Sequence, residues 1–212
     1  MPSHSTSSPT KAEAKRAFLI EQATLCLAQH GYAHVSLRDI AKASGVSLGI
    51  LHYYFSSKED LLLAVISGYK DSFIQELENA LAAEPLEGWL DRLLEVLHGS
   101  LTEKKDIHRL WYDLQVQAMY VPAFREQVNL LRTRIHELIA RLLERLVHQE
   151  THLLRIDLDE AVTIIYAQVD GLFFQAMLEE APTAANALTR FKPTISQLLN
   201  LIFTIPKERG ES

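Results

Sequence analysis

The chain of 212 residues is long enough for one or two domains with a sizeable core, and its 48% hydrophobic and 23% charged residues are ordinary for a globular protein. This composition excludes a disordered, collagen-like or low-complexity chain. The net charge of −6 argues against a general binder of nucleic acid or of anionic membranes.

The charge is unevenly distributed along the chain. Residues 1–60 hold six basic and five acidic residues, whereas residues 61–212 hold 15 basic and 22 acidic ones. The first quarter is therefore the only stretch that does not repel phosphate, although a net charge of +1 is not a basic patch.

The sequence also favours a cytoplasmic protein. No apolar run approaches the ~20 residues that span a bilayer, and the start, Met1 to Thr10, is rich in Ser, Thr and Pro without an apolar segment. Cys26 is the single cysteine, which excludes an internal disulfide and suits a reducing compartment. We expect no membrane span, and Cys26 is more typical of a small buried hydrophobe than of a nucleophile.

Periodicity and end signals predict helices throughout, because Gly and Pro are few and no run alternates apolar and polar residues for long. We expect frayed ends and no internal repeat. The expected helices run from within 9–15 to about 30, from 36 to 44, 48–55, from about 57 to 85, 86–102, 104–120, 122–149, 158–180 and 184–204.

Local signals support these boundaries. Gly31 suits a left-handed cap after the first helix, and Ser36 with Asp39 forms a partial capping box for the second. Ser47 can cap the third helix, and either Ser56, in a box with Glu59, or Ser57 can cap the fourth. The pair Asp170-Gly171 has flanks at helical spacing, so we place this glycine inside a helix, where another helix would approach closely.

The most informative segment is SLRDIAKASGVSLGILHYYFSSKEDL, residues 36–61. It predicts a helix-turn-helix in which Ile40, Ala41, Val46 and Leu51 join two short helices and Gly45 forms the tight turn with a positive φ. In the aromatic run that ends the second of these helices, Phe55 is the natural core residue.

This segment resembles the TetR family of bacterial regulators, whose loose pattern is T-x-x-x-I-A-x-x-A-G-V-S-x-G-x-L-Y-x-Y-F-x-x-K-x-x-L. The match departs from it at Ser36 (for Thr), Ser44 (for Ala) and His52 (for Tyr). GILHYYF together with VDGLFFQAM is most similar to the BetI-type branch. The resemblance implies an all-α fold of about nine helices. It divides the chain into a disordered tail (1–10), a three-helix DNA-binding head (11–57), a helical ligand-binding and dimerisation domain (58–206) and a C-terminal tail (207–212).

The resemblance also implies roles for individual residues. Base edges would be contacted by Arg38, Leu48, Gly49 and His52, and phosphates by Ser36, Ser47, Tyr53, Tyr54 and Lys58. Lys58 is poorly placed for the dipole of its own helix, so an anion such as a phosphate is a better partner for it.

A ligand cavity and a dimer interface are implied for the second domain. Polar and aromatic residues that can line the cavity are Trp111, Gln115, Met119, Tyr120, Phe124, His136, Asp170 and Phe174. Such a lining would favour a cationic ligand, unless Trp111 is plain core and the acids are solvated. Apolar stripes that belong either to the dimer interface or to the core contain Ile165, Val169, Leu172, Phe173, Leu198 and Ile202.

The sequence indicates no catalytic or metal site. Glu144, His148 and His152 share a helical face that zinc could occupy, but a solvated face is favoured. No Ser-His-Asp set, nucleotide loop or CxxC pair occurs, so we expect neither an enzyme nor a cofactor.

We therefore expect a homodimeric, sequence-specific transcriptional regulator, a repressor that a small-molecule effector releases from a palindromic double-stranded DNA operator. The alternative is an all-α small-molecule binding or interaction protein whose helix-turn-helix head does not function. The near-neutral head and the apolar Leu48 and Ile50 favour this alternative slightly.

Overall fold

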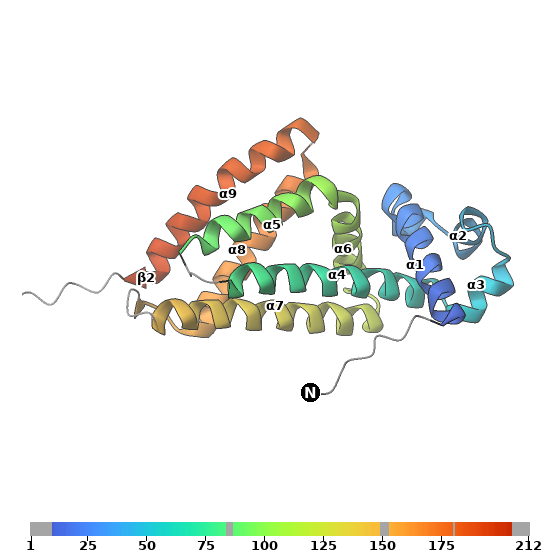
Figure 1. The fold of residues 1–212 in the computed structure, drawn as a ribbon, viewed down its shortest axis with the longest axis horizontal. Coiled ribbons are helices and arrows are strands. Elements are labelled where there is room, and N and C mark those ends of the chain that lie inside the picture. Colours follow the sequence, from blue (N-terminus) through green and yellow to red (C-terminus); the bar gives the residue numbers. More distant parts are fainter. Residues whose placement is uncertain (1–9, 84–86, 149–152, 180, 205–212) are drawn as a thin grey trace, which may run out of the picture.

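The computed structural model describes residues 10–83, 87–148, 153–179 and 181–204, and it confirms an all-α fold with a helix-turn-helix head and a helical second domain (Figure 1). The described helices are α1 (Lys11–His30), α2 (Leu37–Ala43), α3 (Leu48–Tyr54), α4 (Lys58–Ala82), α5 (Trp89–Glu103), α6 (Lys105–Gln117), α7 (Pro122–His148), α8 (Leu158–Leu178) and α9 (Ala181–Ile202). A short 3₁₀ turn, η1 (Tyr32–His34), follows α1.

One feature of the fold departs from the helical expectation. The two-residue strands β1 (Leu153–Leu154) and β2 (Phe203–Thr204) pair antiparallel, so that the end of α9 is joined to the segment before α8. Strands this short contain no alternating pattern, which explains why the sequence did not reveal them.

Side-chain caps define the starts of the helices in the head. Ser36 and Asp39 form the complete capping box of α2, and Ser47 accepts a hydrogen bond from the backbone N–H of Ile50 at the start of α3. The predicted box of Ser56 with Glu59 is wrong, because Ser57 caps α4. Ser56 instead donates its backbone N–H to the carboxylate of Asp60, 2.9 Å away.

Several helix ends differ from the predicted ones by a few residues. Gly31 has the predicted positive φ of 78°, but its ψ of 158° lies outside the left-handed helical region, so the chain leaves α1 extended. Helix α5 begins at Trp89, after Gly88 with a φ of 79°, and α6 ends at Gln117, three residues before Tyr120. Pro193 lies inside α9. The predicted helix ends at residues 85 and 180, and the expected frayed ends apart from Thr10, lie outside the described residues.

Two hydrophobic cores lie along the molecule, and α4 contributes to both. The head core combines α1–α3 with the first half of α4, the end of α6 and the start of α7, whereas the second core lies among α5, α7, α8, α9 and the rest of α4. Figure 1 shows α4 running from the head along α7 into the second domain. A displacement of α4 or α6 therefore reaches both cores.

Candidate DNA-binding surface and ligand cavity

The head has the geometry that the motif predicts. Ile40 and Leu51 are fully buried and Ala41 is 3% exposed, so the two short helices join at these positions. Gly45 has a φ of 63°, and Phe55 is 1% exposed beneath α3. The packing of these residues holds α3 against α2 and leaves the opposite side of α3 in solvent.

A groove on the head gathers five of the nine predicted DNA-contacting residues. It is lined by Ala33, His34, Val35, Ser36, Leu37, Arg38, Leu48, His52 and Lys58. The other four predicted residues do not line the groove: Ser47, Gly49 and Tyr53 are exposed and Tyr54 is half-buried. Tyr53, 81% exposed, packs edge to face on Tyr54. The groove is thus flanked by the N-terminus of α2 and by α3.

Two of the polar groups at this surface have partners within the chain. The hydroxyl of Ser36 donates its proton to the carboxylate of Asp39, so this proton is not available for a hydrogen bond to a phosphate. The hydroxyl of Ser47 only accepts, from Ile50 N–H, so its own proton remains available. Of the two serines, Ser47 is therefore the better prepared to donate to a phosphate.

The ammonium of Lys58 is held by Tyr32. It donates to the Tyr32 carbonyl oxygen and lies 4.0 Å from the centre of the Tyr32 ring. Partial burial lowers the pKa of Lys58 from its ordinary value. Because Lys58 also lines the groove, its charge remains at the surface where the predicted phosphate would lie.

Tyr32 in turn connects the head to the second domain. Its backbone N–H donates to Oδ2 of Asp113 on α6, 3.1 Å away, and its hydroxyl donates to Glu59 on α4, 3.2 Å away. Its ring packs edge to face on Phe124 of α7. The turn that follows Tyr32 lines the groove, so α6 and the groove share one short segment.

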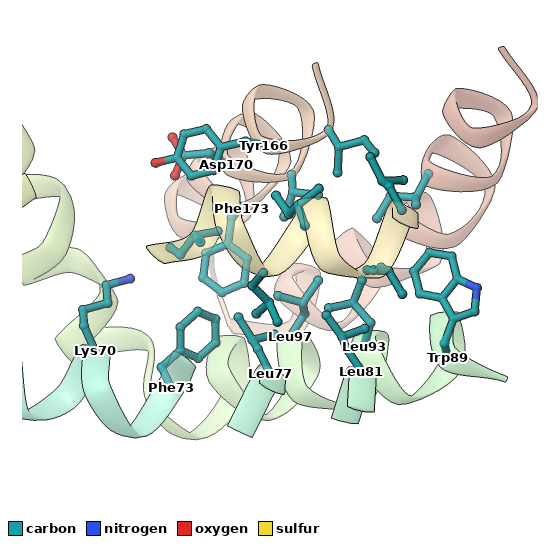
Figure 2. A pocket seen from close by; sticks show the side chains of 18 of the residues that line it. Lys70, Phe73, Leu77, Leu81, Trp89, Leu93, Leu97, Tyr166, Asp170 and Phe173 are labelled. Atoms are coloured by element: carbon teal, nitrogen blue, oxygen red, sulfur yellow. The ribbon is translucent and has the colours of Figure 1, made fainter. Parts of the chain in front are cut away.

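The second domain contains a cavity with about 110 Å³ of space open to the centres of water-sized molecules. Its walls come from α4, α5, α6, α7, α8 and α9, and most of its lining is aliphatic. Figure 2 shows Lys70 at one end and Trp89 at the other, with leucine side chains between them. Both tryptophans of the chain, Trp89 and Trp111, line this cavity.

Lys70 is the most unusual residue of the cavity. It is 3% exposed, and the structure provides no hydrogen-bond acceptor for its amine among the described residues. The amine nitrogen lies 4.4 Å from the ring centre of Trp111 and 5.1 Å from that of Phe73. Burial lowers the pKa of Lys70 to about 7, although the charge of Asp170 acts in the opposite direction.

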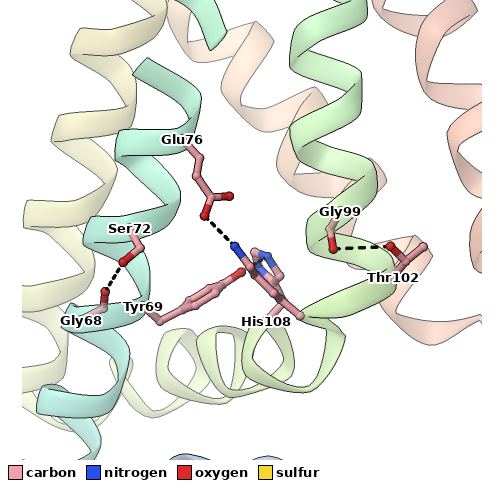
Figure 3. A network of polar contacts seen from close by, with 8 residues as sticks. Gly68, Tyr69, Ser72, Glu76, Gly99, Thr102 and His108 are labelled. Carbon is pink, nitrogen blue, oxygen red and sulfur yellow. Dashed lines mark hydrogen bonds and ion pairs between the residues drawn. The ribbon is translucent and has the colours of Figure 1, made fainter. Parts of the chain in front are cut away.

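A second polar group near this end is also incompletely paired. His108 is 1% exposed, and its Nε2 pairs with the hydroxyl of Tyr69 (Figure 3). Its Nδ1 is buried and has no hydrogen-bond partner among the described residues. Burial, followed by the positive charge of Lys70, lowers the pKa of His108 to about 2, so the imidazole is neutral. The Phe73 ring lies 5.2 Å from the imidazole and contacts the lysine amine, which places both groups around one ring.

Asp170, by contrast, has a donor. The hydroxyl of Tyr112 lies 3.3 Å from Oδ1 of Asp170 and 3.2 Å from its carbonyl oxygen. Burial raises the pKa of the carboxyl group, against the effects of Lys70 and of the Tyr112 hydrogen bond. Tyr166 lines the cavity beside Asp170, and burial raises the pKa of Tyr166 to about 12.

The structure brings only two of the eight predicted ligand residues to the cavity, Trp111 and Asp170. Met119 and Tyr120 are 61% and 77% exposed, because α6 ends before them. Phe124 is fully buried in the head core. The other three do not line the cavity. His136 packs on Tyr166 and Phe174 packs on Tyr112, two residues that do line it, and the side-chain nitrogen of Gln115 is buried without a hydrogen-bond partner among the described residues.

The predicted dimer stripe faces inward for the most part. Ile165, Val169 and Phe173 line the cavity, and Ile202 is 2% exposed. Leu172 and Leu198 are half-buried against the second core. These residues therefore belong mainly to the core, which was the other possibility for this stripe, since an apolar stripe of a helix packs against the interior of its own chain.

Another face of α8 is apolar and exposed. It has heptad-like spacing, and its members are the exposed Ile164, Ala167, Phe174 and Leu178 together with the half-buried Gly171. Leu178 is 72% exposed, and Leu201 on α9 is 70% exposed. The expected close approach to Gly171 does not occur within the chain, because a Cβ at this position would meet nothing within 4 Å.

Sequence reasoning missed Lys70, His108, Tyr112 and Trp89 as cavity residues. A signal for Lys70 was present, because it interrupts the apolar stripe of α4 between Ile66 and Phe73. A lysine at a core position of an amphipathic helix is seldom buried without a role.

Within the described residues, no group of three or more His, Cys, Asp or Glu side chains is arranged to hold a metal ion. The weighed zinc set includes His152, which lies outside the described residues.

Comparison with known proteins decides the family. Residues 19–65 match the family model of the N-terminal domain of bacterial regulatory proteins of the TetR family, and residues 87–200 match that of the C-terminal domain of BetI-type transcriptional repressors. The chain belongs to the TetR family. It is a transcriptional regulator of the BetI type, and proteins of this family are regulators rather than enzymes.

Individual relatives agree with this assignment. The regulator BetI of Escherichia coli K12 is 28% identical over 183 residues, which cover 83% of this chain and 90% of BetI. The regulator PksA of Bacillus subtilis is 28% identical over 192 residues, 87% of this chain and 88% of PksA. A transcriptional regulator of Saccharomonospora viridis, solved in complex with choline, has the same fold with a TM-score of 0.77, 23% identity and coverage of 90% and 98% of the two chains.

One described helix, α8, is long and apolar enough to cross a membrane by length and composition alone, and 28% of its most apolar stretch is buried. In this structure α8 packs on α7 and α9.

Proposed function

We propose that this regulator is a cytoplasmic, homodimeric repressor that binds a palindromic DNA operator through α3 and releases it when a small molecule occupies the cavity. The observation that carries the proposal is the groove on the head, where Arg38, Leu48, His52 and Lys58 meet on one surface. In this arrangement the N-terminal part of α3 enters the major groove. We retain 11–57 as the head and 58–206 as the regulatory domain, with α4 belonging to both cores.

The apolar face of α8 supports the homodimer. Exposed apolar surface of this extent on a regular helix favours a protein interface. Small residues at Ala167 and Gly171, in the middle of the stripe, allow a second helix to come close. A two-fold pairing through α8 and α9 would place two heads on one operator and double the base contacts.

The segment around Tyr32 supports a route from the cavity to the head. His108, Trp111 and Tyr112 of α6 line the cavity, and Asp113, the next residue, holds Tyr32 N–H. A ligand that shifts α6 would thereby move the turn beside the groove. The ligand must favour the released form by only ~1–3 kcal/mol to act as an inducer.

DNA binding is tested by selecting bound duplexes from a random pool and titrating the enriched sequence at two salt concentrations. We expect an enriched palindrome with a Kd near ~10⁻⁸ M and an affinity that falls steeply with salt. Arg38→Ala and Tyr54→Phe are expected to weaken binding, whereas Arg141→Ala, on α7 away from the head, serves as the control. Weak binding without an enriched sequence, even after refolding to remove any retained ligand, would favour the alternative of a non-functional head.

The dimer is tested by Gly171→Glu, measured by light scattering. Since a side chain at Gly171 meets nothing in its own chain, we expect a folded monomer that no longer binds the palindrome tightly. Gly68→Glu is the matched control, because Gly68 is likewise a helical glycine at which a Cβ would meet nothing within 4 Å. A dimer that tolerates Gly171→Glu would place the interface elsewhere.

A further inference from the structure

We propose that the ligand of this cavity is an amphiphilic anion, an aliphatic chain that carries a single carboxylate, with Lys70 as its head-group residue. The inference rests on the proposed function only in taking the cavity as the effector site. It differs from the cationic ligand that the sequence suggested, and the reason lies in which polar groups of the cavity already have partners.

Two hydrogen-bond donors at the Lys70 end of the cavity lack an acceptor. The amine of Lys70 is surrounded by the rings of Trp111, Phe73 and Tyr69 and has no acceptor among the described residues. A buried ammonium without a hydrogen-bonded counter-charge is costly, and a ligand carboxylate supplies both the charge and the acceptor. Nδ1 of His108, also unpaired, can donate to the second carboxylate oxygen when Nε2 accepts from Tyr69.

The acidic group of the cavity is less suited to a cation. Asp170 already accepts a hydrogen bond from Tyr112, and burial raises the pKa of its carboxyl group. A cationic head would also meet the positive charge of Lys70 in the same apolar surroundings.

The remainder of the cavity suits an alkyl chain. From Lys70 to Leu81, α4 contributes Phe73 and Leu77 along one wall, a distance of about 16 Å at about 1.5 Å per residue. Leu93 and Leu97 of α5 lie along the same length, and Figure 2 shows them between Phe73 and Trp89. The end of the cavity near Leu81 and Trp89 has no ionisable side chain in its lining. An elongated ligand with a charged group at one end only, the end next to Lys70, therefore matches the cavity.

The experiment measures ligand binding in the absence of DNA. Because Trp89 and Trp111 both line the cavity and the chain has no other tryptophan, intrinsic fluorescence reports its occupation directly. The probes are decanoate, decanol, decyltrimethylammonium and choline, each below its micellar concentration. We expect decanoate to bind about tenfold or more tightly than decyltrimethylammonium, with choline weaker still.

Lys70→Met separates head-group recognition from the shape of the cavity. We expect this variant to lose about tenfold or more of its affinity for decanoate while it keeps its affinity for decanol, which shows that the cavity is intact. Lys192→Met, at an exposed lysine of α9, should bind all four probes like the wild type. Equal binding of decanoate by Lys70→Met, or a wild type that prefers choline or decyltrimethylammonium, would overturn the proposal.

The DNA assay keeps the two proposals distinguishable. Decanoate that binds through Lys70 and releases the enriched duplex supports both. Decanoate that binds through Lys70 without changing the affinity for DNA supports the ligand class and refutes regulation through this cavity.

Discussion

Replacing Lys70 by methionine should stabilise the protein near neutral pH and below, and the gain should shrink as the pH rises. Methionine preserves the length and much of the shape of the lysine stem while removing the charge. Burial lowers the pKa of Lys70 from 10.5 to about 7, so the folded state holds its proton less tightly than the unfolded state does. Stability therefore rises with pH between these two values.

The magnitude follows from the same difference. A fall in pKa of about 3.5 at about 1.36 kcal/mol for each pKa unit corresponds to about 5 kcal/mol. Nearly all of this penalty is present at pH 6, and about 2 kcal/mol of it is left at pH 9. The contacts of the ammonium with Trp111 and Phe73 offset it by about 0.5–2 kcal/mol. The expected gain of Lys70→Met is thus about 3–4 kcal/mol at pH 6 and about 2 kcal/mol at pH 9, where the folded-state amine is neutral and the ring contacts of the ammonium no longer contribute.

The assay is urea unfolding at pH 6 and pH 9 at one protein concentration, because dimerisation makes apparent stability depend on concentration. The charged and titratable groups around Lys70 are Asp170 of α8, His108 of α6 and Tyr69 of its own helix. His108 is neutral throughout this range, since its pKa is about 2, and the pKa of Tyr69 is raised by burial. The reasoning is refuted if Lys70→Met shows no pH-dependent gain over the wild type, or if Lys192→Met shows the same gain.

Two further predictions concern the head. Gly45→Ala should lower the free energy of unfolding by about 1–2 kcal/mol, because its φ of 63° is unfavourable for a residue with a Cβ. Gly49→Ala, whose Cβ would lie 3.8 Å from the Ser47 hydroxyl oxygen, should be close to neutral or stabilising in the same thermal melts. Asp113→Ala removes the acceptor of the Tyr32 N–H. We expect the ratio of the DNA affinity without decanoate to that with decanoate to fall severalfold. The affinity for decanoate itself, measured by tryptophan fluorescence, should stay near the wild-type value. An unchanged ratio would show that this hydrogen bond carries none of the coupling.

The head was largely predictable because its determinants are local. A serine followed three residues later by a carboxylate, a glycine between two short apolar segments, and a phenylalanine after two tyrosines each specify a cap, a turn or a buried side chain within one turn of helix. The failure at Ser56 is instructive, since Ser56 and Ser57 each have an acidic residue three positions later. Only the path of the chain into α4 decides between them.

The cavity and the dimer face were not predictable in the same way. The lining comes from six helices, so its members are far apart in sequence and share no spacing. Met119 and Tyr120 were predicted to line the cavity because they continue the polar and aromatic residues of α6, but both lie past the end of that helix. The apolar stripe predicted for the dimer interface lies on the inner face of α8. The outer face contains Ala167 and Gly171, which are too small to give a strong hydrophobic signal in the sequence.

Helix α6 is where the two halves of the molecule constrain each other. Its Trp111 contacts the amine of Lys70 in the cavity and is counted in the head core, and Leu110 and Leu114 pack in that core as well. A ligand that engages Lys70 must therefore act on a side chain that also supports the head. Since packed interiors respond to such changes by small rigid shifts rather than by local compression, the adjacent Asp113 would transmit the shift to Tyr32 and the groove. A cavity that satisfies its one unpaired ammonium only when occupied is thereby placed to report that occupation to the DNA-binding surface.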